Sequence, residues 1–114
     1  MPQRNTLETN PATTVLVVGG PPLLVECARK ASNAVPGAEV VGCELRDAPT
    51  RVAELWPFAI VMSEDLYAFD SAEFDALARD VKARLITMTI DTNTANARQQ
   101  ELRTKLAEAF RRRG

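Results

Sequence analysis

The fold of this protein is decided by the stretch VLVVGG at residues 15–20. Four consecutive apolar residues, mostly β-branched, are typical of a strand that is buried on both faces of a parallel sheet. The two glycines end the strand, and Pro21 and Pro22 suit the first turn of a helix, where their missing N–H groups are not needed. The sequence here therefore predicts a strand that leads directly into a helix.

The same alternation continues along the chain. Short apolar segments at residues 38–43, 58–62 and 84–90 predict three further strands. Between them, and after the last of them, apolar residues recur at three- and four-residue spacing, which predicts helices with one buried face. The residues with this spacing are Leu24, Cys27, Ala28, Ala31 and Val35, then Phe74, Leu77, Ala78 and Val81, then Leu102, Leu106, Ala109 and Phe110.

Polar residues mark the beginning of two of these helices. Asp47 and Ser71 stand where N-caps are expected, and Pro49 suits a first turn. Four strands that alternate with four helices predict a four-stranded parallel sheet with helices on both faces, because right-handed crossovers leave few other packings. We therefore expect an α/β fold, a three-layer sandwich, over residues 14–114. Residues 1–13 are polar and show no periodicity, which predicts a flexible N-terminal leader.

The composition argues against several classes of function. Lys and Arg number 14 and Asp and Glu 15, so the net charge of -1 provides no basic field for nucleic acid. The chain has no histidine, the usual general base and zinc ligand, which argues against most hydrolases and metalloenzymes. No apolar run is long enough to cross a bilayer, and Cys27 and Cys43 lie singly in apolar segments, as buried thiols do in a reducing compartment. We expect a cytoplasmic protein without a membrane anchor, catalytic residues, a metal or a cofactor.

Several segments in the middle of the chain resemble a known family. They are PGAEVVG at residues 36–42, AELWP at 53–57, FAIVM at 58–62, FDSAEF at 69–74 and LITMT at 85–89. In this order they resemble the central part of a response-regulator receiver domain, which has a CheY-like, flavodoxin-like fold. The likeness implies a sheet of that kind, truncated because Thr89 is followed almost directly by the terminal helix and the fifth strand is missing.

The resemblance also implies that the phosphorylation chemistry of receivers is lost. Receivers hold magnesium with an acidic pair after the first strand, where this chain has Gly19 and Gly20. Ser63 stands at the position of the phosphate-accepting aspartate, although a hydroxyl does not form a labile acyl phosphate. The hydroxyl residue after the fourth strand is retained as Thr89, whereas the lysine after the fifth strand is missing. An alignment shifted by one residue places Glu64 at the acceptor position, where its carboxylate would imitate the phosphorylated state; a solvated loop charge is the alternative.

These observations lead to two expectations about function. The first is a non-catalytic pseudo-receiver in bacterial signalling, which binds a partner protein without being phosphorylated. The alternative is a small phosphotransferase-like or phospho-ligand-binding domain whose crevice contains Gly19, Ser63 and Thr89 at the carboxyl ends of the strands. Pro21 and Pro22 argue against a phosphate site, because they remove two N–H groups that would bind the anion.

The surface for a partner is expected in two places. Tyr67 and Phe69 lie in the predicted loop after the third strand, as anchors for a partner or as core residues, and Trp56 is expected to cap the core. The apolar run at residues 85–90 becomes a sheet edge when the fifth strand is missing, and such an edge is usually paired or covered. We therefore expect a homodimer through the fourth strand and the terminal helix. The partner-binding candidates are Tyr67, Phe69, Leu85, Thr87, Leu102, Leu106 and Phe110.

Overall fold

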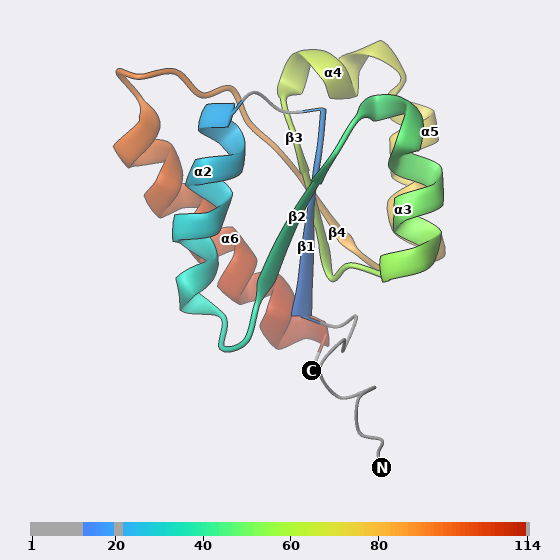
Figure 1. The fold of residues 1–114 in the computed structure, drawn as a ribbon, viewed down its shortest axis with the longest axis horizontal. Helices are drawn as coiled ribbons and strands as arrows, with labels where there is room; N and C mark the ends of the chain where they lie inside the picture. The colour runs from blue at the N-terminus through green and yellow to red at the C-terminus, as the bar shows by residue number, and fades with distance from the viewer. Residues whose placement is uncertain (1–12, 20–21, 114) are drawn as a thin grey trace.

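The chain forms a four-stranded sheet in which all neighbouring strands are parallel, in the order β2-β1-β3-β4 (Figure 1). The computed structural model describes residues 13–19 and 22–113. Apart from Thr13, the predicted leader lies outside the described residues, as do Gly20 and Pro21. The strands are β1 (Thr14–Val18), β2 (Glu39–Cys43), β3 (Ala59–Met62) and β4 (Arg84–Thr87).

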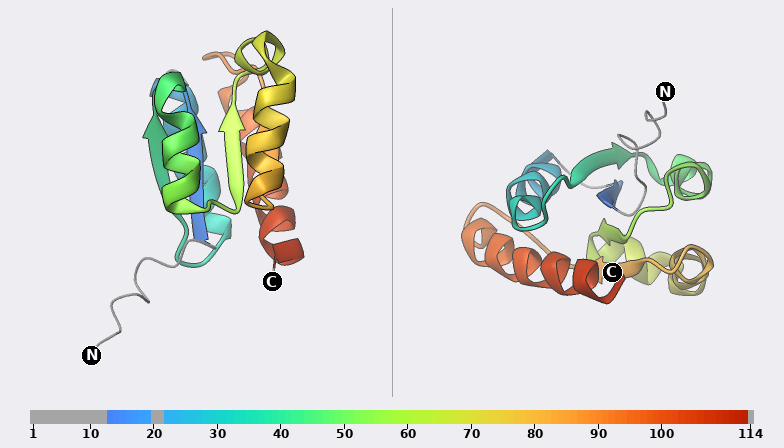
Figure 2. Two further views of the ribbon diagram at one scale, coloured as in Figure 1. Left: turned by 90° about the vertical axis from the view of Figure 1, so that its right-hand side faces the viewer. Right: turned by 90° about the horizontal axis from the view of Figure 1, so that it is seen from below.

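Helices cover both faces of this sheet, which confirms the predicted three-layer α/β sandwich. The α-helices are α2 (Pro22–Ala31), α3 (Ala48–Leu55), α4 (Glu64–Phe69), α5 (Ser71–Asp80) and α6 (Ala95–Arg113), and two single-turn 3-10 helices are η2 (Ser32–Ala34) and η3 (Leu45–Asp47). Helices α2 and α6 lie on one face, and α3 and α5 lie on the other (Figure 2). The arrangement is that of a flavodoxin-like fold with four strands.

The alternation of side chains along the central strand divides the core into two layers. Val15 and Val17 of β1 pack toward α2 and α6, and Leu16 and Val18 pack toward α3 and α5. All five residues of β1 are buried, as expected for a strand with one strand on each side and helices above and below. The prediction that the VLVV segment lies at the centre of a parallel sheet is confirmed.

Helix α3 begins and ends where the sequence predicted. Pro49 lies in its first turn and Asp47 occupies the N-cap position, although the Asp47 side chain makes no capping hydrogen bond. The helix ends at Leu55, and Trp56 follows in the left-handed conformation with φ 47°. The helix does not continue through Trp56, because Pro57 disfavours the helical conformation of the residue before it.

Three local predictions were wrong. Residues 64–69, expected to be a loop, form α4, a helix of six residues that is too short to show a helical period in the sequence. Ser71 is the first residue of α5 rather than its cap, because Asp70 takes the N-cap position between α4 and α5. The fourth strand ends at Thr87 instead of continuing to Ile90, although the N–H of Met88 still donates to the carbonyl of Met62 at 3.1 Å.

Within the described residues, no helix is both long and apolar enough to cross a membrane.

Candidate functional site

The carboxyl ends of β1, β3 and β4 meet at the edge of the sheet where α4 lies, at the top of Figure 1. Parallel strands present their carboxyl ends at one edge, which is the place where open α/β sheets bind ligands. Gly19, Ser63 and Thr89 follow β1, β3 and β4 in the chain, so the predicted crevice residues do lie at one edge. Gly20 lies outside the described residues.

Gly19 is exposed, and it lies close to α4. It has φ +59° and its N–H donates to the carbonyl of Cys43 at 2.7 Å, which ties the end of β1 to the end of β2. A Cβ atom built on Gly19 would lie 2.8 Å from Cδ2 of Leu66 in α4. At the first of the two glycines that stand where receivers carry an acidic pair, a side chain would therefore meet the aliphatic side chain of Leu66.

Ser63 acts as the N-cap of α4. Its Oγ accepts a hydrogen bond from the N–H of Leu66 at 3.2 Å, and its carbonyl accepts one from the N–H of Tyr67 at 3.1 Å. These bonds satisfy N–H groups that a helix terminus otherwise leaves unpaired. The hydroxyl that the sequence places at the phosphate-accepting position thus has a structural partner.

Glu64 and Thr89 are hydrogen-bonded to each other. The hydroxyl of Thr89 donates to Oε1 of Glu64 at 3.0 Å across a separation of 25 residues. The bond joins the first residue of α4 to the segment that follows β4, and both side chains are exposed. Sequence reasoning left Thr89 without a partner, because nothing local in the sequence indicates that these two segments meet.

The remaining carboxylates near this edge do not gather into a cluster. Within the described residues, no three His, Cys, Asp or Glu side chains converge on a point that could hold a metal ion. Asp91 instead stabilises the turn that precedes α6. Its Oδ1 accepts hydrogen bonds from the N–H groups of Asn93 and Thr94, both at 2.9 Å. A side-chain oxygen that caps a turn in this way is a common use of aspartate.

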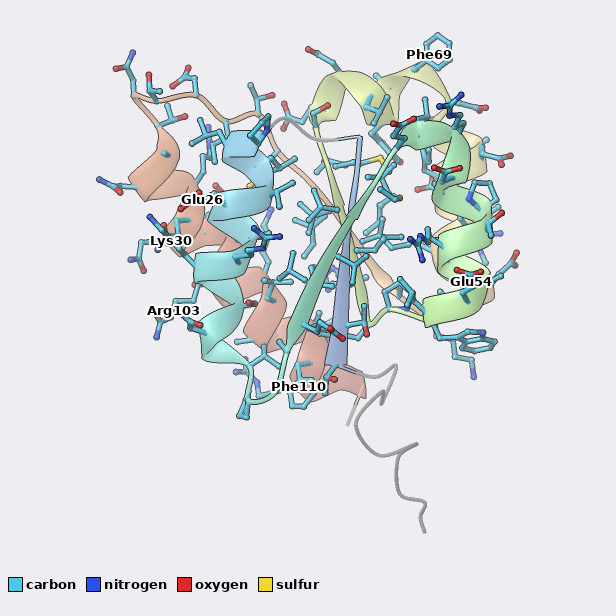
Figure 3. The ribbon with its side chains drawn as sticks, viewed as in Figure 1. Glu26, Lys30, Glu54, Phe69, Arg103 and Phe110 are labelled. Carbon is cyan, nitrogen blue, oxygen red and sulfur yellow. The ribbon has the colours of Figure 1, made fainter. Side chains whose placement is uncertain are left out.

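Tyr67 and Phe69, two of the partner-binding candidates, lie on α4. Phe69 is 82% exposed and points away from the protein at the top of Figure 3, so it does not pack in the core. The hydroxyl of Tyr67 donates to Oδ1 of Asp75 at 2.9 Å, and this bond to a carboxylate raises the pKa of Tyr67 above its usual value. The ring of Tyr67 also lies 6.5 Å from the ring of Phe74.

A groove of about 210 Å³ begins beside Phe69. Leu45, Ala48 and Pro49 line one side, where η3 leads into α3, and Phe74 and Leu77 of α5 line the other. The groove is mainly apolar, and it ends at the charged side chains of Arg46, Asp70 and Glu73.

The structure corrects two candidates on α6. Leu102 and Leu106 are 0% exposed and pack against α2 and the sheet, so they are core residues and not available to a partner. Phe110 is half-buried, with its ring in an edge-to-face contact with Phe58 at 5.6 Å. The spacing that identified these residues marks the buried face of a helix, and the structure shows that the sheet of the same chain buries it.

Leu85 and Thr87 lie on β4, the last strand at one edge of the sheet. Both are half-buried, and no strand lies beyond them in the described part of the chain. The predicted sheet edge is therefore present, although it is shorter than expected.

The two cysteines differ in accessibility. Cys27 of α2 is buried, as predicted, whereas Cys43 at the end of β2 is half-buried, so the prediction of a buried thiol there was wrong. Burial raises the pKa of both thiols, and neither forms a disulfide. Since the thiolate is the reactive form of cysteine, both side chains are poor nucleophiles near neutral pH.

Comparisons of this chain with protein-family models, with curated proteins and with solved structures gave no match. The candidate site consequently rests on the geometry of the chain itself.

Proposed function

We propose that this protein is a receiver-like module that binds a partner protein without being phosphorylated. The observation that carries the proposal is the hydrogen bond between Thr89 and Glu64. In receivers, which this chain resembles, the hydroxyl residue after the fourth strand responds to phosphorylation, and Thr89 stands at that position. Here that hydroxyl is already bound to a carboxylate that the chain supplies.

The groups around this bond favour a structural role over phosphoryl transfer. Leu66 lies against Gly19, where a receiver would place oxygen ligands for magnesium, and the Ser63 hydroxyl caps α4. The Glu64 carboxylate then supplies a permanent negative charge, and its hydrogen bond to Thr89 holds α4 and the segment after β4 together. The surface next to α4 would thereby stay in one arrangement without an activating modification.

Phe69 is the residue that we propose as the anchor for the partner. Phe69 is 82% exposed and lies beside a mainly apolar groove, and aromatic side chains dominate the energetics of many interfaces. Glu64 and Phe69 are the first and last residues of α4, so the bond to Thr89 and the anchor belong to the same short helix.

Phosphorylation is tested by incubating the protein with acetyl phosphate and magnesium and measuring its intact mass. We expect no phosphoryl adduct. An adduct on Ser63 or Glu64 would refute the proposal and favour the alternative, a phosphotransferase-like domain. Thermal shift with phosphodonors, magnesium and nucleotides gives a second readout, because a ligand at 100 times its Kd adds about 2.7 kcal/mol of stability.

Partner binding is tested by affinity capture from the source cell with three variants. Phe69→Ala should lose the partner that the unmodified protein retains, whereas Tyr67→Phe on the same helix keeps its ring and should retain it. Glu64→Gln removes the charge that Thr89 faces, and we expect weaker retention. Equal retention of one partner by all three variants would show that α4 is not the binding surface.

A further inference from the structure

A cleft of about 420 Å³ lies at the opposite edge of the sheet, where β3 and β4 begin. Its walls come from the end of α3, the segment between α5 and β4, and the last turns of α6, at the bottom of Figure 3 near Glu54 and Phe110. Trp56 and Phe58 supply its aromatic surface, and Lys82, Arg84 and Arg112 supply positive charge. None of these residues belongs to the carboxyl edge, so binding in this cleft would be independent of the receiver-like function.

Trp56 lines this cleft, and its backbone conformation costs free energy. It follows α3 with φ 47°, a left-handed conformation that favours glycine and costs other residues free energy, and its side chain is 47% exposed. Lys82, which follows α5, has φ 59° and lines the same cleft. These two are the non-glycine residues with positive φ in the described part of the chain. Backbone strain of this kind is concentrated at binding sites in folded proteins.

The charged side chains of the cleft show how a carboxylate fits there. Glu108 lies between two guanidinium groups, with its Oε1 4.0 Å from Arg84 and its Oε2 4.0 Å from Arg112. Both distances exceed those of a direct hydrogen bond, so the N–H donors of the two arginines are not used up by Glu108. No other ion pair of Arg84 or Arg112 occurs within the described residues. Among the described residues, Arg84 and Arg112 thus share one carboxylate and keep N–H donors for another.

We propose that this cleft binds an acidic segment of a partner protein. The carboxylates of such a segment would lie on Arg84 and Arg112, and an apolar side chain next to them would pack on the indole of Trp56. Tryptophan and arginine are among the residue types enriched at the energetic centres of protein interfaces. A nucleic acid would need several further Lys or Arg contacts to its phosphates, and a chain with a net charge of -1 provides no broad basic surface for them.

Trp56 is the single tryptophan of the chain, so its fluorescence reports on this cleft directly. The unmodified protein is titrated with a short, terminally blocked peptide of alternating glutamate and leucine. We expect a saturable change of Trp56 fluorescence that weakens as salt is added, since the attraction is between partly exposed charges. A peptide of alternating lysine and leucine should produce no such change.

Variants distinguish this cleft from the rest of the surface, with binding followed by the anisotropy of a labelled peptide. Arg84→Gln combined with Arg112→Gln should weaken binding by about tenfold or more, because charge-assisted hydrogen bonds are lost. Arg29→Gln combined with Arg103→Gln removes the same charge from exposed positions outside the cleft and should leave the affinity unchanged. Trp56→Gly suits the left-handed backbone and should preserve folding while weakening binding.

Three outcomes would overturn the proposal. They are no saturable binding of the acidic peptide by the unmodified protein, equal loss of binding in both pairs of arginine variants, and unchanged affinity in Trp56→Gly. A saturable fluorescence change with inorganic phosphate or a mononucleotide, together with none for the acidic peptide, would likewise refute it and identify a site for small anions.

Discussion

Gly19 shows how a single residue fixes the carboxyl edge of the sheet. Its positive φ turns the chain at the end of β1 and directs its N–H to the carbonyl of Cys43. A Cβ at this position would lie 2.8 Å from Cδ2 of Leu66, so the Leu66 side chain would have to shift. The glycine is therefore needed both for the backbone conformation and for the packing of α4.

Replacing Gly19 tests this double requirement. Gly19→Ala should lower the free energy of unfolding by about 1 to 2 kcal/mol, because an L-residue is disfavoured in the left-handed conformation and its Cβ meets Leu66. Gly37→Ala has the same conformational penalty at φ +75° but open space around it, and should cost less. Gly42→Ala makes only ordinary contacts and should be nearly neutral. Urea unfolding ranks the three variants, and equal losses at Gly19 and Gly37 would contradict the role of Leu66.

Tyr67 provides a second test at this scale, because it is the single tyrosine of the chain. The carboxylate of Asp75 accepts a hydrogen bond from the Tyr67 hydroxyl and disfavours the phenolate, which raises the pKa of Tyr67. Any stability from this bond is present below the ordinary pKa of tyrosine and is lost as the pH rises through the higher value of the folded protein. Asp75→Asn should return the pKa of Tyr67 toward its ordinary value, as measured by the ultraviolet absorbance of the phenolate. An unchanged titration would exclude the bond in solution.

Helix α4 shows at the scale of elements why sequence patterns are incomplete. Six residues are too few to display a hydrophobic period, and the three residues that shape the helix act through different contacts. Ser63 caps it, Leu66 packs over Gly19, and Glu64 binds Thr89. The resemblance to receivers assigned Ser63 as a lost phosphate acceptor. A serine followed directly by two acidic residues, Glu64 and Asp65, is also a local signal for the start of a helix.

Capping gives an element-scale prediction with a matched control. Ser63→Ala should destabilise the protein by about 1 kcal/mol, because the N–H of Leu66 loses its partner. Asp47→Ala also removes an N-cap residue, but its side chain makes no capping hydrogen bond, so we expect a change of less than about 0.5 kcal/mol. Thermal unfolding of both variants measures the difference, and the opposite order would show that the capping geometry is different in solution.

The open edge at β4 is the feature of the whole molecule that bears on assembly. The N–H of Arg84 donates to the carbonyl of Phe58, and that of Met88 donates to the carbonyl of Met62. Because successive residues of a strand direct their N–H groups to opposite sides, the N–H groups of Leu85 and Thr87 face the open edge. The homodimer expected from the sequence would use this edge without Leu102 and Leu106, which lie in the core.

Sedimentation of the full chain tests that dimer. We expect a dimer at concentrations of about tens of micromolar, since self-association depends on protomer concentration. Thr87→Pro removes a donor on the open side alone and should leave a folded monomer. Phe69→Ala, at a distance from this edge, should remain dimeric. A monomer for the unmodified chain at these concentrations would rule out pairing through β4.

The strands, the principal helices and their layered arrangement were determined by the sequence alone. Residues such as Val15, Val17, Leu102 and Leu106 carry this information in their spacing, because a strand or helix repeats over a few residues and must bury one face. The same spacing did not reveal whether a partner or the chain itself covers α6.

Only the tertiary structure decided which side chains meet. Thr89 lies beside Glu64 although 25 residues separate them, and Trp56, Arg84 and Arg112 line one cleft although they come from three different segments. Trp56 was expected to cap the core, yet it is 47% exposed. The physical reason is that contacts between distant segments depend on how the helices dock on the sheet, and no local period in the chain encodes that packing.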